Sequence, residues 1–160
     1  MRTRGGLLGI LLVALVIAAC NTPKPTSAPP PTRDEALSFL AQIVALAQQG
    51  DFDALCSMAG DGNCEFKLDD AGRDRVPSAA PTVWSIAGVP TTTNGDQTSL
   101  GGIVLGLCGI DALGRGFDSE MLVFRDTDTT MRAINPVYWG QDKVARGDRT
   151  SLGPPDPGGC

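Results

Sequence analysis

The chain has 160 residues and a formal net charge of −5, with 13 Lys and Arg against 18 Asp and Glu. This acidic balance argues against nucleic-acid binding, which requires Lys and Arg to contact phosphates. The absence of histidine excludes Ser-His-Asp and Cys-His catalysis and removes the commonest metal ligand. We expect no metal ion and no cofactor.

Residues 1–19 have the three-part pattern of a secretory signal peptide. Arg2 and Arg4 form a short basic segment, and residues 5–19 carry no charge and are mostly Leu, Val, Ile and Ala. A helix that spans a bilayer needs about 20 apolar residues, so this run is short for a permanent membrane span.

The apolar run ends in Ile17-Ala18-Ala19-Cys20, which resembles the lipobox of bacterial lipoprotein signal peptides. The resemblance implies that a diacylglyceryl group is attached to the Cys20 sulfur and that the chain is cleaved before this residue. We therefore expect a lipoprotein anchored on the extracytoplasmic face of the cell membrane, with the Cys20 lipid as its membrane contact. The alternative is an ordinary signal peptide that ends in a cysteine by chance.

Residues 20–32 read as the lipidated cysteine and a Pro-rich linker. Proline lacks the backbone N–H and keeps the preceding residue out of the α region, so this segment suits neither a helix nor a central strand. At about 3.1 Å per residue, the twelve residues after Cys20 reach roughly 37 Å. We expect the linker to hold a folded domain clear of the lipid headgroups. Its prolines are Pro23, Pro25, Pro29, Pro30 and Pro31.

Four cysteines remain after Cys20, namely Cys56, Cys64, Cys108 and Cys160. Their even number fits a disulfide framework and permits three full pairings. The short separation of Cys56 and Cys64 favours a local bridge between them, and Cys108 and Cys160 would then be free or paired with each other. Zinc is a weak alternative, because the chain has no CxxC motif and no histidine.

The folded part is expected to begin with helices. Thr32 and Glu35 match a capping box, and apolar residues follow them at helical spacing. Gly50 ends this helix as a left-handed C-terminal residue, and Asp51 is placed to cap a second, short helix. A third helical turn is expected around residues 65–71.

After Pro77 the pattern changes to strands, because β-branched and aromatic residues become frequent. Asn94-Gly95 is a strong signal for a hairpin between the first two strands. The four expected strands are Thr82–Thr92, Leu100–Cys108, Met121–Arg125 and Met131–Asn135.

Two segments of this part read as irregular. Gly109 to Glu120 is expected to be a long loop, which would be a flexible connection, a lid, or a support that places Arg115 over an anion. Residues 141–160 contain many Gly, Pro and charged residues and few apolar anchors. They read as a flexible C-terminal tail, which leaves residues 33–140 as the globular domain.

Helices followed by an antiparallel meander define an α+β fold, with N-terminal helices packed on a curved, cone-like, four-stranded sheet. This order and the junction Gly50-Asp51-Phe52-Asp53-Ala54-Leu55 resemble the nuclear transport factor two-like superfamily. The resemblance covers about residues 33–140 and implies a hydrophobic cleft between the long helix and the sheet. The superfamily includes both enzymes and binding modules, so the fold does not decide the function.

Two functions from different classes remain. The first is a non-catalytic lipoprotein domain that binds a partner protein or a small apolar ligand, with Trp84, Tyr138 and Trp139 as candidate contacts. Their alternative role is packing inside the domain. The second is a small cone-fold enzyme that uses an Asp or Tyr138 without histidine, and Asp126 is the nearest candidate. A general base near pH 7 would need a carboxyl with a raised pKa, and no carboxylate motif predicts one, so we favour the first.

Overall fold

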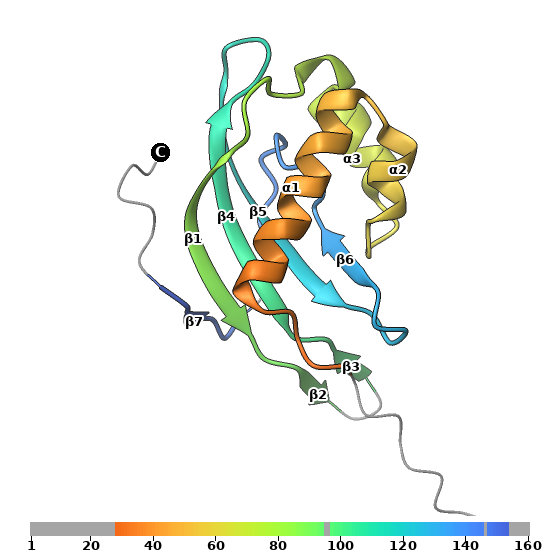
Figure 1. Ribbon diagram of the computed structural model, residues 1–160, viewed down its shortest axis with the longest axis vertical. Coiled ribbons are helices and arrows are strands. Elements are labelled where there is room, and N and C mark those ends of the chain that lie inside the picture. The colour runs from red at the N-terminus through yellow and green to blue at the C-terminus, as the bar shows by residue number, and fades with distance from the viewer. Residues whose placement is uncertain (1–27, 95–96, 146, 154–160) are drawn as a thin grey trace, which may run out of the picture.

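The structure of the protein is a computed structural model, which describes residues 28–94, 97–145 and 147–153. The described residues form an α+β domain with helices before the sheet (Figure 1). The helices are α1 (Arg33–Gln49), α2 (Phe52–Ser57), α3 (Cys64–Ala71) and the 3-10 helix η1 (Arg73–Arg75). The strands are β1 (Thr82–Val89), β2 (Thr92–Asn94), β3 (Gln97–Ser99), β4 (Gly102–Ile110), β5 (Gly116–Arg125), β6 (Met131–Ile134) and β7 (Thr150–Ser151).

Local signals in the sequence account for the helix boundaries. Thr32 and Glu35 form both hydrogen bonds of the capping box, because the Glu35 N–H donates to the Thr32 side chain and the Thr32 N–H donates to the Glu35 carboxylate. Gly50 ends α1 with φ +72°, a left-handed conformation that glycine adopts without steric cost. The Asp51 side chain then accepts the Ala54 N–H and caps α2. The three expected helices are therefore present.

The main sheet is antiparallel and has five strands in the order β6-β5-β4-β1-β7. Four of them form the expected meander, and the fifth, β7, comes from the C-terminal segment. The expected first strand is divided, since β1 ends at Val89 and β2 pairs with β3 in a separate hairpin. Gly95, the expected turn glycine of this hairpin, lies outside the described residues.

The main core lies between one face of the sheet and the three helices, and α1 runs along this face (Figure 1). We call it the helix face. Its central side chains come from β4 and β5, where every second residue points toward α1. The fully buried side chains that fill this space include Ile43, Leu55, Leu68, Leu105, Leu107, Met121, Tyr138 and Trp139. No described helix combines the length and the apolar character that crossing a membrane requires.

The C-terminal segment is packed against the opposite face of the sheet, which we call the outer face. Val144 is buried in a second apolar cluster with Val104 and Leu122. Arg149 forms an ion pair with Glu120 of β5 at 2.8 Å. The expectation of a flexible tail from residue 141 therefore does not describe residues 141–145 and 147–153. The apolar side chains of the outer face require a segment that covers them. The sequence indicates this segment only weakly, because its contacts are those of Val144 and the ion pair of Arg149.

The region expected to be a long loop, Gly109–Glu120, is mostly strand. β4 and β5 pair continuously from Gly102 opposite Phe124 to Ile110 opposite Gly116, so the loop consists of residues 111–115 only. The Phe117 ring lies over Gly109, where an added Cβ would be 2.8 Å from the ring. Glycine has a low strand propensity, and the segment is a strand here because its backbone pairs continuously with β5.

Candidate functional site

The β4–β5 hairpin ends in a tip, residues 110–115, whose five-residue turn is organised by one buried carboxylate. Asp111 accepts the N–H groups of Leu113 at 2.9 Å and Arg115 at 2.8 Å. The guanidinium of Arg75, from η1, donates to the same carboxylate at 2.8 Å. The Ala112 N–H also donates to the Arg75 carbonyl at 3.2 Å. These contacts hold the tip against the helical part of the domain.

The tip presents apolar side chains to solvent. Ile110 is 61% exposed and Leu113 is 59% exposed, and the Arg115 side chain beside them is 55% exposed. Single exposed apolar residues are normal in soluble proteins, but two of them on one braced turn, next to a cation, form a defined surface. We call Ile110, Leu113 and Arg115 the tip surface.

A cavity of about 720 Å³ lies next to the tip, between the β4–β5 hairpin and the C-terminal segment. Lys143 and Asp118, the two charged residues of its lining, form an ion pair at 2.7 Å. The Lys143 ammonium also lies 5.8 Å from the centre of the Trp84 ring, within the range of a cation–π contact. The cavity is lined by Thr82, Cys108, Gly109, Ile110, Gly116, Phe117, Asp118, Gln141 and Lys143.

None of the three aromatic residues predicted as contacts lines this cavity, and Trp84 contacts a lining residue, Lys143. Trp84 is half-buried and sits at a β-bulge in β1. Its ring covers Gly106 on the outer face, where an added Cβ would be 2.7 Å from the indole. The indole N–H has no hydrogen-bond partner among the described residues.

Tyr138 and Trp139 lie instead in the main core. Trp139 is 1% exposed, and its indole N–H donates to the Gly72 carbonyl at 3.0 Å. The two rings meet edge to face with 5.2 Å between their centres. Burial raises the pKa of the Tyr138 hydroxyl to about 12. Both side chains belong to the main core between the helices and the sheet and are buried there, so they are not exposed for contact with a ligand.

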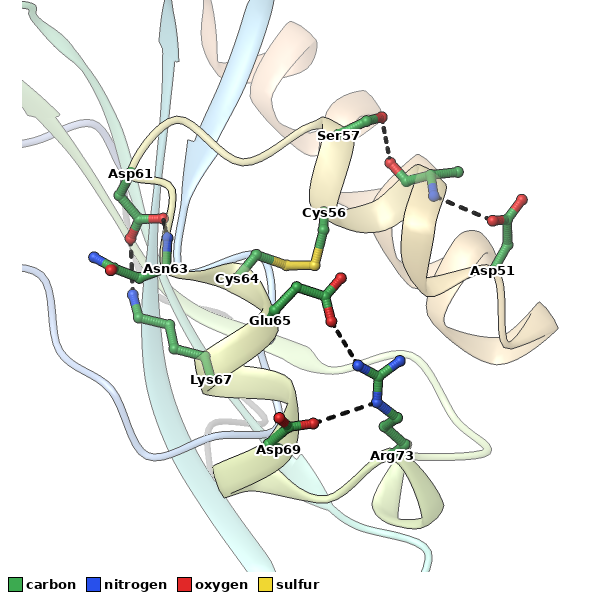
Figure 2. Close-up of a disulfide and its surroundings, with 11 residues drawn as sticks. Asp51, Cys56, Ser57, Asp61, Asn63, Cys64, Glu65, Lys67, Asp69 and Arg73 are labelled. Carbon is green, nitrogen blue, oxygen red and sulfur yellow. Dashed lines mark hydrogen bonds and ion pairs between the residues drawn. A yellow bond between two sulfur atoms is a disulfide. The ribbon is translucent and has the colours of Figure 1, made fainter.

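Cys56 and Cys64 form the expected disulfide, which links the end of α2 to the first residue of α3 (Figure 2). Their Cα atoms are 5.4 Å apart. On the same helix, Lys67 forms an ion pair with Asp61 at 2.9 Å and closes the connection between the two helices (Figure 2). The predicted lipidation residue, Cys20, lies outside the described residues.

Hydrogen bonds lower the pKa of two carboxyl groups near the cavity and the tip, Glu120 and Asp111. Hydrogen bonds from Arg149, with the N–H of Val144, lower the pKa of Glu120. Burial alone would raise the pKa of Asp111, but the hydrogen bonds from Arg115 and Arg75 outweigh it, and the pKa lies below its ordinary value. Asp126, the carboxylate considered for an enzyme, accepts the N–H of Thr127 in the β5–β6 turn. In the described ranges, no three Cys, Asp or Glu residues could hold a metal ion together.

Comparisons with known proteins provide no relative from which a function could be transferred. No family model, no curated protein and no solved structure matches the chain. The candidate site therefore depends on the geometry of the chain itself.

Sequence reasoning missed the tip surface. The glycines around Ile110 and Leu113, among them Gly114 and Gly116, predict a loop over these two residues. Two apolar residues around Asp111 in a Gly-rich turn were the available signal, but their exposure depends on the pairing of β4 with β5.

Proposed function

We propose that the protein is a lipoprotein, anchored at Cys20 on the extracytoplasmic face of the cell membrane, whose domain binds a partner protein without catalysis. The proposal includes a signal peptide over residues 1–19 and a Pro-rich tether over residues 20–32. It also assigns the domain to the cone-like fold of the nuclear transport factor two-like superfamily. Helices that precede a curved antiparallel sheet support this assignment.

The observation that carries the proposal is the placement of the tip surface relative to the tether. Pro30 and Pro31 lie beside Val89 and Gly102, at the start of β4, whereas the tip begins at Ile110, the last residue of β4. The nine residues of β4 cover roughly 26 Å at about 3.3 Å per step. Residues 30 and 31, at the end of the proposed tether, and the tip therefore lie at opposite ends of the domain (Figure 1), and the tip can face outward from the membrane.

The chemistry of the tip surface defines the partner that would fit it. Ile110 and Leu113 offer two aliphatic side chains, and Arg115 adds a cation at their side. A complementary surface would have an apolar pocket bordered by carboxylates, because binding energy at interfaces concentrates on buried apolar and Arg anchors. The contacts of Asp111 hold the tip in one conformation, which lowers the entropic cost of docking.

The state of the acidic groups supports a function without catalysis. A general base near pH 7 would require a carboxyl with a raised pKa, whereas those of Glu120 and Asp111 are lowered. The Tyr138 hydroxyl is buried, and its pKa of about 12 makes it a poor acid at neutral pH.

Substitution of Cys20 tests the membrane anchor. The Cys20→Ser variant is expected to lose all metabolically incorporated fatty acid and to accumulate as an unprocessed precursor, because serine offers no thiol to the lipid transfer reaction. The matched control is Cys160→Ser, which removes a cysteine outside the lipobox and should keep the label. Fatty-acid label on the Cys20→Ser protein would contradict the anchor.

A photo-crosslinking residue at position 113 tests the tip surface in intact cells. We expect a discrete heterologous adduct, and adding Ile110→Asp to the same chain should lower its yield at least tenfold. Stability should change by less than about 0.5 kcal/mol, since Ile110 is exposed. The crosslinker placed at Phe66, which is 75% exposed on α3, is the matched control and should not form this adduct.

Three outcomes would contradict docking of a partner protein at the tip. The first is an adduct that forms equally well from position 66. The second is an adduct that is insensitive to Ile110→Asp. The third is an adduct between two copies of this chain, which would make the chain its own partner.

A further inference from the structure

Cys108 forms a disulfide with a cysteine that lies outside the described residues. It is buried on β4 and takes part in a disulfide bond. The other two cysteines of the described residues, Cys56 and Cys64, are bonded to each other. The partner of Cys108 is therefore one of the two cysteines outside the described residues, Cys20 or Cys160.

We infer that Cys160 is this partner and that the bridge locks the C-terminal segment to β4 beside the cavity. The assignment rests on the proposed function, because a lipid attached through a thioether leaves Cys20 without a thiol. Cys160 is then the remaining cysteine of the chain that can pair with Cys108.

The direction of the C-terminal segment agrees with this pairing. Thr150 pairs with Gly88 and Ser151 with Ala87, and the Leu152 N–H donates to the Ile86 carbonyl at 3.0 Å. The chain thus advances along β1 toward Thr82.

Thr82 is the residue that pairs with Cys108. From the level of Ile86 to that of Thr82 the strand covers roughly 13 Å, and the two strand spacings from β7 across β1 to β4 add about 10 Å. The seven residues 154–160 can span up to about 25 Å when extended, so Cys160 can reach Cys108.

Formation of the bridge is an oxidation. The thiols of Cys108 and Cys160 lose two protons and two electrons, and one sulfur–sulfur bond forms. The electron acceptor is the disulfide of an extracytoplasmic thiol–disulfide oxidoreductase, which is reduced to a dithiol through a mixed-disulfide intermediate.

The bridge would restrain residues that line the cavity. Cys108, Gln141 and Lys143 all line it, and the last two belong to the segment that the bridge closes. On the same segment, the Val144 N–H donates to Glu120 at 3.0 Å, and Arg149 binds Glu120 with both terminal nitrogens. The bridge and this cluster together would keep the segment on the outer face.

Peptide mapping of the full chain tests the pairing. The protein is extracted from membranes, its free thiols are alkylated, and it is digested without reduction. We expect a linked peptide pair that contains Cys108 and Cys160, and a lipid on Cys20. If Cys20 has a lipid while Cys108 and Cys160 are both alkylated, the inference fails and the proposed anchor stands. If the bridge is found but Cys20 has no lipid, only the anchor fails. A link between Cys108 and Cys20 would overturn both.

Hydrogen exchange tests the locking. Cys160→Ser should expose a thiol at Cys108 and raise the exchange rates of the Val144 and Leu152 amides at least tenfold. Cys108→Ser should raise them equally, and the double variant should raise them no further, because either substitution removes the same bond. The Cys56→Ser/Cys64→Ser variant removes a bridge elsewhere and should leave these two amides unchanged. The locking would be overturned if the exchange rates of the two amides did not change in Cys160→Ser. It would also be overturned if the two substitutions had additive effects in the double variant.

Discussion

Replacing Trp139 by alanine is expected to lower the free energy of unfolding by about 3–5 kcal/mol. The indole is 1% exposed in the main core, and its removal leaves a cavity that the surrounding side chains fill only in part. The substitution also removes the edge-to-face contact with Tyr138 and the hydrogen bond from the indole N–H to the Gly72 carbonyl. The measurement is urea unfolding of the domain, with a lower midpoint at an unchanged m value.

Two further variants separate packing from ligand binding at Trp139. Trp139→Phe keeps an aromatic ring and should lose less stability than the alanine variant. Phe66→Ala removes a ring that is 75% exposed and should change the free energy of unfolding by less than about 0.5 kcal/mol. If Trp139→Ala unfolded at the same urea concentration as the parent, the core position of this residue would be contradicted, and its role as a ligand contact would return.

Replacing both Cys56 and Cys64 by serine is expected to cost about 2.5 kcal/mol of stability. The bridge closes a short loop between α2 and α3 and so removes conformations from the unfolded chain. This estimate follows the chain-entropy description, in which the cost of losing the bridge grows with the logarithm of the loop length. Urea unfolding of the parent protein with and without a reductant, beside the double serine variant, provides the measurement.

The control for this variant lies next to the bridge. Ser57→Ala removes one exposed hydrogen bond, from the serine hydroxyl to the Ala54 carbonyl, and should have little effect. In the presence of the reductant, which also opens the disulfide of Cys108, the parent and the double serine variant should unfold at similar urea concentrations. A double variant as stable as the oxidised parent would show that the bridge does not stabilise the fold.

The sequence by itself determined the features whose causes are local. The capping box of Thr32 and Glu35, the end of α1 at Gly50 and the Asp51 cap each depend on residues within a few positions. The Cys56–Cys64 bridge belongs to the same class, because the two cysteines are eight positions apart. The order of helices and strands followed from these signals and from the change in hydrophobic period.

Only the tertiary structure decided the features that depend on distant residues. Gly109 lies in a strand that pairs with β5, where Phe117 lies opposite it and covers it, and the periodicity of one segment does not reveal that contact. β7 pairs with β1 across more than sixty positions. An aromatic residue such as Trp139 has the same sequence signature in a core and in a binding site. Its burial, like the exposure of Ile110, was decided by which surfaces of the folded chain cover one another.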